Sequence, residues 1–348
     1  MARLSADALR ELATAILRAA GAPDANARAV ANSLVLSNLH GHDSHGIAQL
    51  LSYIGQIQKG SLDPGVSPKI LNERPTAALI DGGWGFGQVA AAYATEVLIQ
   101  KVRASGVAAV GIQRCNHIGR LGEFAEQAAN AGIIAMITLC GGGRGTSTAP
   151  YGGAGKTLGT NPFAFGLPAK KFPPVIVDFA TTVVAGGKIA LAREKGELLP
   201  EGWLLDRNGM PTRDPNDFGN GGMLRTMAEY KGFGLSMVAE ALGGALTGAT
   251  RFEEGEKTRN CVFMWGIATD IFLPPGEYAR LEDRSIAKIK ATPPAPGFER
   301  VIVPGERGRL NAARNERDGI ELPESTWQKL VELAQRHGVS ATEISAES

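Results

Sequence analysis

The sequence has no excess of charge of either sign, few cysteines and no long apolar run. Its 36 lysine and arginine residues balance 35 aspartate and glutamate residues to a formal net charge of +1, so nothing favours a nucleic acid or a membrane surface as a partner. No segment approaches the roughly 20 consecutive apolar residues of a membrane span, and no apolar run follows Arg3 as it would in a signal peptide. The three cysteines, Cys115, Cys140 and Cys261, lack the paired spacing of a disulfide framework or a zinc site. We therefore predict a cytoplasmic protein with no nucleic-acid partner and no membrane segment.

Glycine, by contrast, is abundant, with 45 residues among 348, whereas aromatic residues make up only 6% of the chain. The glycines show no triplet period, which excludes a collagen-like chain. Many lie in short pairs after apolar runs, a pattern that fits either tight turns or close approach of the backbone to a flat, phosphate-bearing ligand. Because the chain is longer than most single domains, we expect two lobes.

Alternating helix and strand signals predict an α/β protein. Two helices are expected within residues 5–36, a third over 47–58 and a closing helix over 323–337. Between them, strands are expected at 76–81, 107–112, 133–139 and 174–178, with helices over 88–105, 121–130, 185–195 and 231–246. This alternation is typical of a sheet covered by helices.

Three of the five histidines lie close together in the segment HGHDSHG at residues 40–46. Histidine exchanges protons near neutrality, with an unperturbed pKa of about 6.5, so this cluster is a candidate site of chemistry. One possibility is a metal site formed by His40 and His42 with Asp43 or His45. The other is proton transfer by a single histidine, with His40 and His42 in structural roles. His45 fits proton transfer best, because the hydroxyl of Ser44 can orient its ring.

Two glycine-rich segments resemble nucleotide-binding loops but have the wrong spacing. Residues 152–157 end in a Gly-Lys-Thr sequence, yet the first glycine of a phosphate-binding loop would fall on Pro150. Residues 83–87 contain three glycines that do not match the dinucleotide fingerprint of the Rossmann fold. A bound dinucleotide would therefore not use the usual Rossmann turn.

Two further polar residues lie at the ends of predicted strands. His117 follows the strand at 107–112, at the end where α/β proteins place ligand contacts, although a surface loop position would explain it equally well. Asp178 ends the strand at 174–178 and could bind ribose hydroxyls, orient an imidazole or cap a helix.

Several motifs, taken together and in order, resemble the type-2 malate/L-lactate dehydrogenases, a family of NAD(P)-dependent 2-hydroxyacid oxidoreductases. The matching motifs are GHDSHG at 41–46, GFGQ at 85–88, HIG at 117–119, PYGG at 150–153, GTNP at 159–162, DFATT at 178–182, KGFGL at 231–235 and PGE at 304–306. Each motif is weak by itself, but eight in the family order cover residues 5 to 335.

The resemblance implies an α/β fold distinct from the Rossmann fold. A mixed-sheet NAD(P)-binding lobe, expected over residues 116–306, is inserted into an α/β lobe built from both chain ends. That outer lobe is expected to comprise residues 1–115 plus 307–348 and to contain the helical and substrate-binding parts. The resemblance also implies a homodimer that forms the active site.

The resemblance further assigns roles to residues of this chain. Ser44 and His45 correspond to the relay that donates or accepts the proton, and His117 to a histidine at the cofactor and substrate. Gln49 and Thr160 correspond to substrate contacts. The positions that correspond to contacts with the NAD or NADP cofactor are His117, Ile118, Gly119, Arg120, Leu121, Asp178, Phe179, Ala180, Lys231, Gly232, Pro304, Gly305 and Glu306.

One position departs from the family pattern. Many members carry an arginine four residues after the relay histidine, where it binds the substrate carboxylate, whereas this chain has Gln49. An amide cannot reproduce the bidentate, charge-assisted contact of a guanidinium. Either Arg114, Arg120 or Arg144 supplies the charge, or the substrate is not a simple small 2-hydroxy acid.

We therefore predict an oxidoreductase that transfers a hydride between NAD(P)H and a malate- or lactate-like 2-oxo or 2-hydroxy acid, with no metal ligands. An imidazole, His45 in the first place and His117 in the second, would move the hydroxyl proton. The alternative is a metal-dependent hydrolase or lyase that uses His40, His42 and His45. A binding protein that retains the fold without activity is a third possibility.

Overall fold

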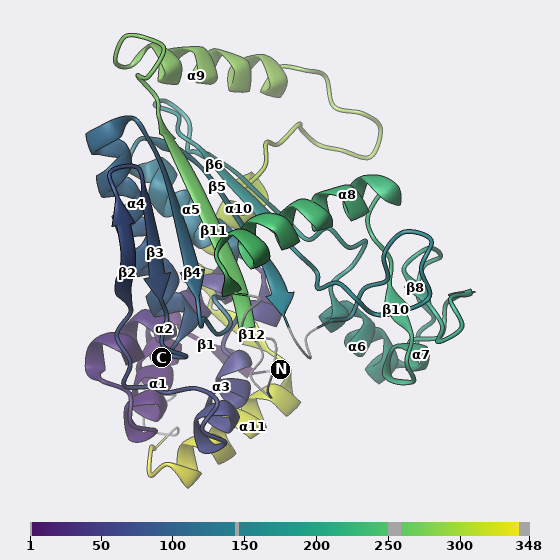
Figure 1. Cartoon of the computed structure of the whole chain (residues 1–348). Coiled ribbons are helices and arrows are strands. Elements are labelled where there is room, and N and C mark those ends of the chain that lie inside the picture. Colours follow the sequence, from purple (N-terminus) through teal and green to yellow (C-terminus); the bar gives the residue numbers. More distant parts are fainter. Residues whose placement is uncertain (1, 143–145, 250–258, 341–348) are drawn as a thin grey trace.

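The computed structural model describes residues 2–142, 146–249 and 259–340, and a mixed seven-stranded sheet lies at its centre (Figure 1). The strands in spatial order are β2 (Lys69–Arg74), β3 (Ala77–Asp81), β4 (Val107–Gln113), β11 (Arg259–Ala268), β5 (Ile133–Gly142), β6 (Phe163–Leu167) and β7 (Val175–Phe179). Only β3 and β4 run parallel, and the other neighbours are antiparallel. This sheet confirms the prediction of a mixed sheet that is not of the Rossmann type.

Helices cover both faces of the sheet. On one face lie α4 (Gly87–Ser105) and α5 (Leu121–Asn130), where they bury apolar side chains such as Leu98 and Phe124 against the strands. The other face is partly covered by α8 (Tyr230–Ala239) and by the helix that follows it. Because α4 is followed by the capping residue Gly106, whose φ is +79°, the chain can turn directly into β4.

The prediction of one helix over residues 231–246 is wrong in one respect. The α-helix ends at Ala239 and continues as a π-helix, Glu240–Leu246. The chain approaches the sheet very closely here, since a Cβ atom on Gly243 would lie 2.2 Å from the carbonyl oxygen of Cys261. This close approach to β11 accompanies the change from the regular helical pattern.

Both ends of the chain build a second core. The short strands β1 (Ala2–Leu4) and β12 (Ile320–Leu322) pair antiparallel, and the surrounding helices are α1 (Ala6–Ala19), α2 (Asp24–Leu39), α3 (Gln49–Gln58), α10 (Glu306–Asp318) and α11 (Glu324–Arg336). Fully buried residues from both ends, such as Leu9 and Leu330, meet in this core. The two helices predicted within residues 5–36 are therefore α1 and α2, and the lobe built from both chain ends is confirmed.

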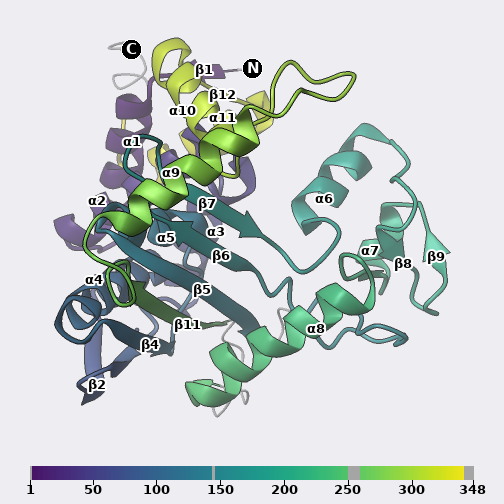
Figure 2. The ribbon, with the colours of Figure 1, turned by 90° about the horizontal axis from the view of Figure 1, so that it is seen from above.

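A small group of elements lies to one side of the sheet (Figure 2). It comprises α6 (Gly186–Lys195), α7 (Asn216–Gly219) and a sheet of three short strands, β8 (Leu204–Leu205), β9 (Pro211–Thr212) and β10 (Met223–Leu224). It has a small core of its own that includes Ile189 and Leu199. The remaining helix, α9 (Glu277–Lys290), packs through Ile286 against Val175 and Val303.

The large sheet contains strands from both sides of the boundary predicted between residues 115 and 116. The division into residues 1–115 plus 307–348 and residues 116–306 therefore stays a prediction. Among the described helices, none combines the length and the apolar character needed to cross a membrane.

Candidate active site

His45 and His117, which are 72 positions apart in the sequence, lie together in the structure. His45 ends a short 3-10 turn, Asp43–His45, between α2 and α3, whereas His117 lies between β4 and α5. Their rings are stacked, with centroids 5.5 Å apart and planes inclined by 24°. Both residues are intermediate in exposure, so the pair is not sealed within the core.

The turn that holds His45 is fixed by Asn38 at the end of α2. The Asn38 side chain accepts a hydrogen bond of 2.7 Å from the backbone N–H of Ile47 and donates one of 2.7 Å to Asp43. Gly46 lies against the same amide, because a Cβ atom there would be 2.2 Å from Asn38 Oδ1. The motif therefore needs glycine at this position for a packing reason.

The hydroxyl of Ser44 orients the His45 ring, as the sequence predicted was possible. Ser44 Oγ lies 3.0 Å from His45 Nδ1. Burial lowers the pKa of His45 below its ordinary value, and the nearby positive charge of Arg120 lowers it further. The imidazole is therefore neutral near pH 7 and can accept a proton.

His117 is held by a buried pair of side chains. The hydroxyl of Tyr53 lies 2.7 Å from His117 Nδ1, and Gln88 Nε2 donates a 2.7 Å hydrogen bond to that hydroxyl. Burial lowers the pKa of His117 to about 3, with a further contribution from His45. Sequence reasoning did not single out Tyr53 or Gln88, although Gln88 belongs to the GFGQ motif at 85–88.

Gln49 is engaged within its own turn. Its Nε2 donates a 2.7 Å hydrogen bond to the carbonyl oxygen of Ser44. Of the arginines that could replace the missing guanidinium, Arg114 forms an ion pair with the buried Asp81, and Arg144 lies outside the described residues. Arg120 is the remaining candidate, and it is close enough to His45 to affect its pKa.

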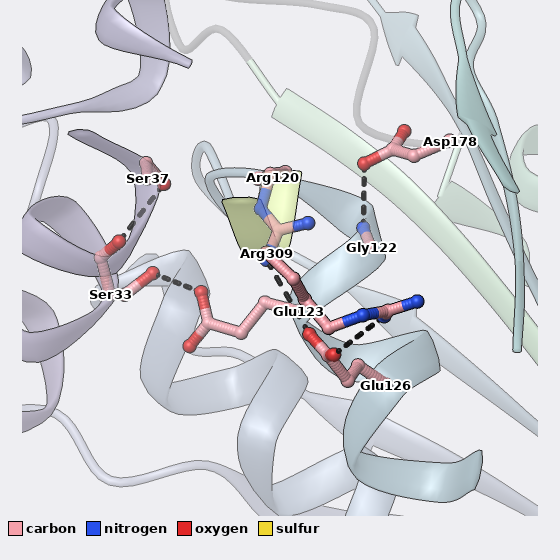
Figure 3. Close-up of polar contacts among 8 residues, drawn as sticks. All are labelled: Ser33, Ser37, Arg120, Gly122, Glu123, Glu126, Asp178 and Arg309. Carbon is pink, nitrogen blue, oxygen red and sulfur yellow. Dashed lines mark hydrogen bonds and ion pairs between the residues drawn. The ribbon is translucent and has the colours of Figure 1, made fainter. Parts of the chain in front are cut away.

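Arg120 is a buried cation near Glu126 and Arg309 (Figure 3), and it lines a large cavity. Its side chain is only 6% exposed, and Nε and Nη2 have no hydrogen-bond partner among the described residues. Its nearest opposite charge is Glu126, 3.9 Å away, which also pairs with Arg309 at 3.5 Å. Buried guanidinium nitrogens that lack hydrogen bonds are energetically costly, and an anion that enters the cavity could supply those bonds.

The cavity beside Arg120 has a volume of about 640 Å³. Basic side chains dominate its lining, namely Arg120, Lys188, Arg307, Arg309, His40 and His42, and the acidic ones are Glu126 and Asp178. Burial, followed by the charge of Arg120, lowers the pKa values of His40 and His42 to about 4. The sequence predicted structural roles for His40 and His42. It did not predict that they line a cavity.

Asp178, at the end of β7, fastens the start of α5. It accepts a 2.7 Å hydrogen bond from the backbone N–H of Gly122. Burial raises its pKa, although this hydrogen bond and Arg120 act in the opposite direction. Gly122 must be small, because a Cβ atom there would lie within 2.8 Å of both Arg120 and Asp178.

The residues predicted to bind the cofactor lie in different parts of the structure, and only some of them line the cavity. Arg120, Asp178, Pro304 and Gly305 line the cavity. Ile118 and Leu121 instead belong to the buried core against the sheet, and Glu306 accepts hydrogen bonds from Lys290 and from the backbone of Val303.

A second group of predicted residues lies around Thr181. The carbonyl oxygen of Thr160 accepts hydrogen bonds from the backbone and hydroxyl of Thr181, at 2.9 and 3.0 Å. The carbonyl oxygen of Thr181 in turn accepts one of 2.8 Å from Met227, just before Lys231 and Gly232. Gly232 packs on this backbone, because a Cβ atom there would lie 2.7 Å from the Thr181 carbonyl oxygen. Three segments distant in the sequence, including Phe179 and Ala180, are thus joined.

The histidine cluster does not form a ligand set. Across the parts of the chain that the structure describes, no three histidine, cysteine, aspartate or glutamate side chains come together as they would around a metal ion. His45 stacks on His117, whereas His40 and His42 line the cavity.

Known proteins resemble this chain over nearly its whole length. The family model for malate/L-lactate dehydrogenase matches residues 4–331. A malate dehydrogenase of Pyrococcus abyssi is 34% identical over 98% of this chain and 97% of its own length, and hydroxycarboxylate dehydrogenase B of Escherichia coli is 34% identical over 99% of this chain and 97% of its own length. The structure of sulfolactate dehydrogenase from Methanocaldococcus jannaschii matches with a TM-score of 0.89 at 31% identity, covering 98% of this chain and 99% of that one.

All three relatives are dehydrogenases, so the metal-dependent hydrolase or lyase finds no support. The resemblance found in the eight motifs is confirmed by the match over residues 4–331. The chain therefore belongs to the malate/L-lactate dehydrogenase family and is a 2-hydroxyacid oxidoreductase.

Proposed function

We propose that this enzyme uses NAD or NADP to interconvert a 2-oxo acid and its 2-hydroxy acid, with His45 as the group that moves the proton. The observation that carries the proposal is the stacked pair of His45 and His117, together with Arg120, which lines a cavity with basic walls and is close enough to His45 to lower its pKa. The pair supplies proton-transfer groups, and the cavity supplies positive charge for anionic ligands.

The cavity fits the phosphates of a dinucleotide. Arg120 has buried, unpaired N–H groups, and Arg307, Arg309 and Lys188 add positive charge around the same space. Charge-assisted hydrogen bonds from guanidinium groups to phosphate are strong. Asp178, Pro304 and Gly305 line the cavity too. The nicotinamide, when bound, accepts or supplies the hydride.

The surroundings of the His45 ring suit the proposed proton transfer. Ser44 lies at Nδ1, so Nε2 is the ring nitrogen left for exchange with the substrate. The lowered pKa keeps the ring neutral near pH 7, and with its single proton on Nδ1, donated to Ser44 Oγ, Nε2 can accept the proton of a hydroxyl group during oxidation. During reduction the same nitrogen returns a proton to the oxygen of the 2-oxo acid.

Gln49 and Thr160 are proposed to contact the substrate. Because Gln49 carries no charge and Arg120 is assigned above to the cofactor phosphates, the substrate carboxylate would meet a neutral amide at this position. The identity of the side chain on the 2-oxo acid would then depend on the loop and helix residues around Thr160.

The active unit is proposed to be a homodimer. Apolar side chains on α8 and the π-helix are exposed, including Met237, Val238 and Leu246. These two helices pack on the seven-stranded sheet. The sheet also borders an apolar cavity of about 520 Å³, which is lined by residues such as Trp265 and Ile267. Extended apolar surfaces of this kind mark protein contacts. Sedimentation of the purified protein tests the proposal, and a monomer at micromolar concentration would contradict it.

A cytoplasmic location is proposed from the cysteines. Cys115 and Cys140 are buried and form no disulfide within the part of the chain that the structure describes, as expected in a reducing compartment. Fractionation of cells that produce the protein tests the location, and recovery in a secreted fraction would contradict it.

A panel of 2-oxo acids, each with NADH and with NADPH, tests the reaction directly. Oxidation of the reduced nicotinamide is followed by its near-ultraviolet absorbance. We expect turnover with at least one carboxylate substrate, insensitive to a metal chelator. Absence of turnover across malate-, lactate- and sulfolactate-related oxo acids would contradict the proposed substrate class.

A further inference from the structure

A short chain of buried hydrogen bonds ends at the Nδ1 atom of His117. It consists of Gln88 on α4, Tyr53 on α3 and the Nδ1 atom of His117, with both distances at 2.7 Å. Tyr53 and Gln88 are each only 2% exposed. Water therefore cannot take the place of either partner, and the directions of these hydrogen bonds are set by the protein.

The direction of the chain follows from the donors and acceptors available. Gln88 donates to the Tyr53 oxygen, so the single hydroxyl proton of Tyr53 is left to donate to His117 Nδ1. Burial raises the pKa of Tyr53, so its hydroxyl keeps this proton. A neutral imidazole that accepts at Nδ1 carries its own proton on Nε2.

The opposite direction would be less favourable. If the Gln88 amide were turned over, its oxygen would accept from Tyr53, and both N–H groups of the amide would occupy the place of Oε1. In the observed orientation, Gln88 Oε1 has no hydrogen-bond partner among the described residues. Buried N–H groups without partners are rarer in proteins than carbonyl oxygens without partners, because each lost hydrogen bond is costly.

We propose that Tyr53, held by Gln88, is a positioning residue that locks His117 in the tautomer with its proton on Nε2, so that His117 presents a hydrogen-bond donor to the substrate oxygen. The inference rests on the proposed function and divides the work between the two stacked rings. His117 polarises the oxygen of the 2-oxo acid as a neutral donor and keeps its proton. His45, which takes up a proton from water before the reduction, gives that proton to the oxygen as the carbonyl carbon accepts the hydride, so the carbonyl becomes a hydroxyl group and both rings end neutral.

The tautomer can be measured without any substrate. In the full-length protein labelled with ¹⁵N-histidine, two-bond proton–nitrogen spectra distinguish a protonated Nε2 from a protonated Nδ1, and the His117→Gln variant identifies the His117 signals. We expect a single neutral species with the proton on Nε2. A proton on Nδ1 would overturn the proposal. Because this readout needs no turnover, it can fail while the dehydrogenase activity stands, and the reverse also holds.

Two variants test the role of the hydrogen-bond chain. Tyr53→Phe removes only the hydroxyl and should give a mixture of His117 tautomers, with kcat lower by about tenfold, the effect of one hydrogen bond. The Kd for NADH should stay unchanged. Tyr93→Phe makes the same chemical change on α4, beside the core of the sheet, and should change neither measurement.

Gln88→Met is the second variant, and it keeps the proposal testable if Tyr53→Phe fails to fold. Without the amide donor, the Tyr53 hydroxyl can accept from Nδ1, so both tautomers should appear and kcat should fall. A single Nε2 tautomer and wild-type kcat in both variants, at a normal melting temperature, would overturn the positioning role.

Discussion

Replacing Arg120 by methionine removes the most deeply buried positive charge of the candidate cofactor cavity. The side chain is 6% exposed, and two of its nitrogens have no hydrogen-bond partner among the described residues, so a bound phosphate could accept hydrogen bonds from both. A hydrogen bond to a charged group contributes about 1.5–3 kcal/mol. Loss of one such bond should weaken the binding of NADH or NADPH roughly 10- to 150-fold.

The assay is a fluorescence titration of the reduced cofactors, which gives Kd without a substrate. Arg120→Lys keeps the charge but loses the planar fork, so its Kd should be intermediate. Arg314→Met on α10 removes an exposed arginine and should leave Kd unchanged. The pKa of His45 should also rise in Arg120→Met, because Arg120 lowers it in the native protein. Unchanged Kd values for both cofactors in a folded Arg120→Met protein would refute the reasoning.

Three further predictions concern packing, pH and the substrate. Gly46→Ala should lower the free energy of unfolding by about 1–3 kcal/mol, because its Cβ would lie 2.2 Å from Asn38 Oδ1; an unchanged urea midpoint would count against this packing. The free energy of unfolding should fall as the pH is lowered from about 6.5 towards 4. In this range His40 and His117 bind protons in the unfolded chain but not in the folded protein, where their pKa values are about 4 and about 3. Urea titrations that show constant stability over this range would contradict the prediction. Gln49→Arg should lower KM for small 2-oxo acids by restoring a bidentate carboxylate contact, and a KM unchanged for every acid of a panel would show that this position does not contact the carboxylate.

The helices near the N-terminus could be predicted because their signals are local. Ser5 caps α1 by accepting a 3.2 Å hydrogen bond from Ala8, and buried residues follow at helical spacing. The strand β11, by contrast, was not predicted, although it lies between β4 and β5 in the sheet. Its partners are more than 100 residues away in the sequence, so no short-range pattern indicates where it pairs.

In the candidate site, too, the local contacts could be predicted from the sequence and the tertiary contacts could not. Ser44 and His45 are neighbours within one motif, and the structure shows the hydroxyl at the ring nitrogen. The stacking on His117 and the basic cavity depend on tertiary packing. Lys188 and Arg309 reach the cavity from α6 and α10, and their separation in the sequence gives no sign that they share one space.

The account depends most on His45 as the group that moves the proton, and the His45→Ala variant tests it most directly. With the preferred 2-oxo acid, kcat should fall roughly 10²- to 10⁴-fold, while the Kd for the reduced cofactor, measured by fluorescence, should stay near the wild-type value. Wild-type kcat in a folded His45→Ala protein would contradict the account, because the proton would then have to pass through another group.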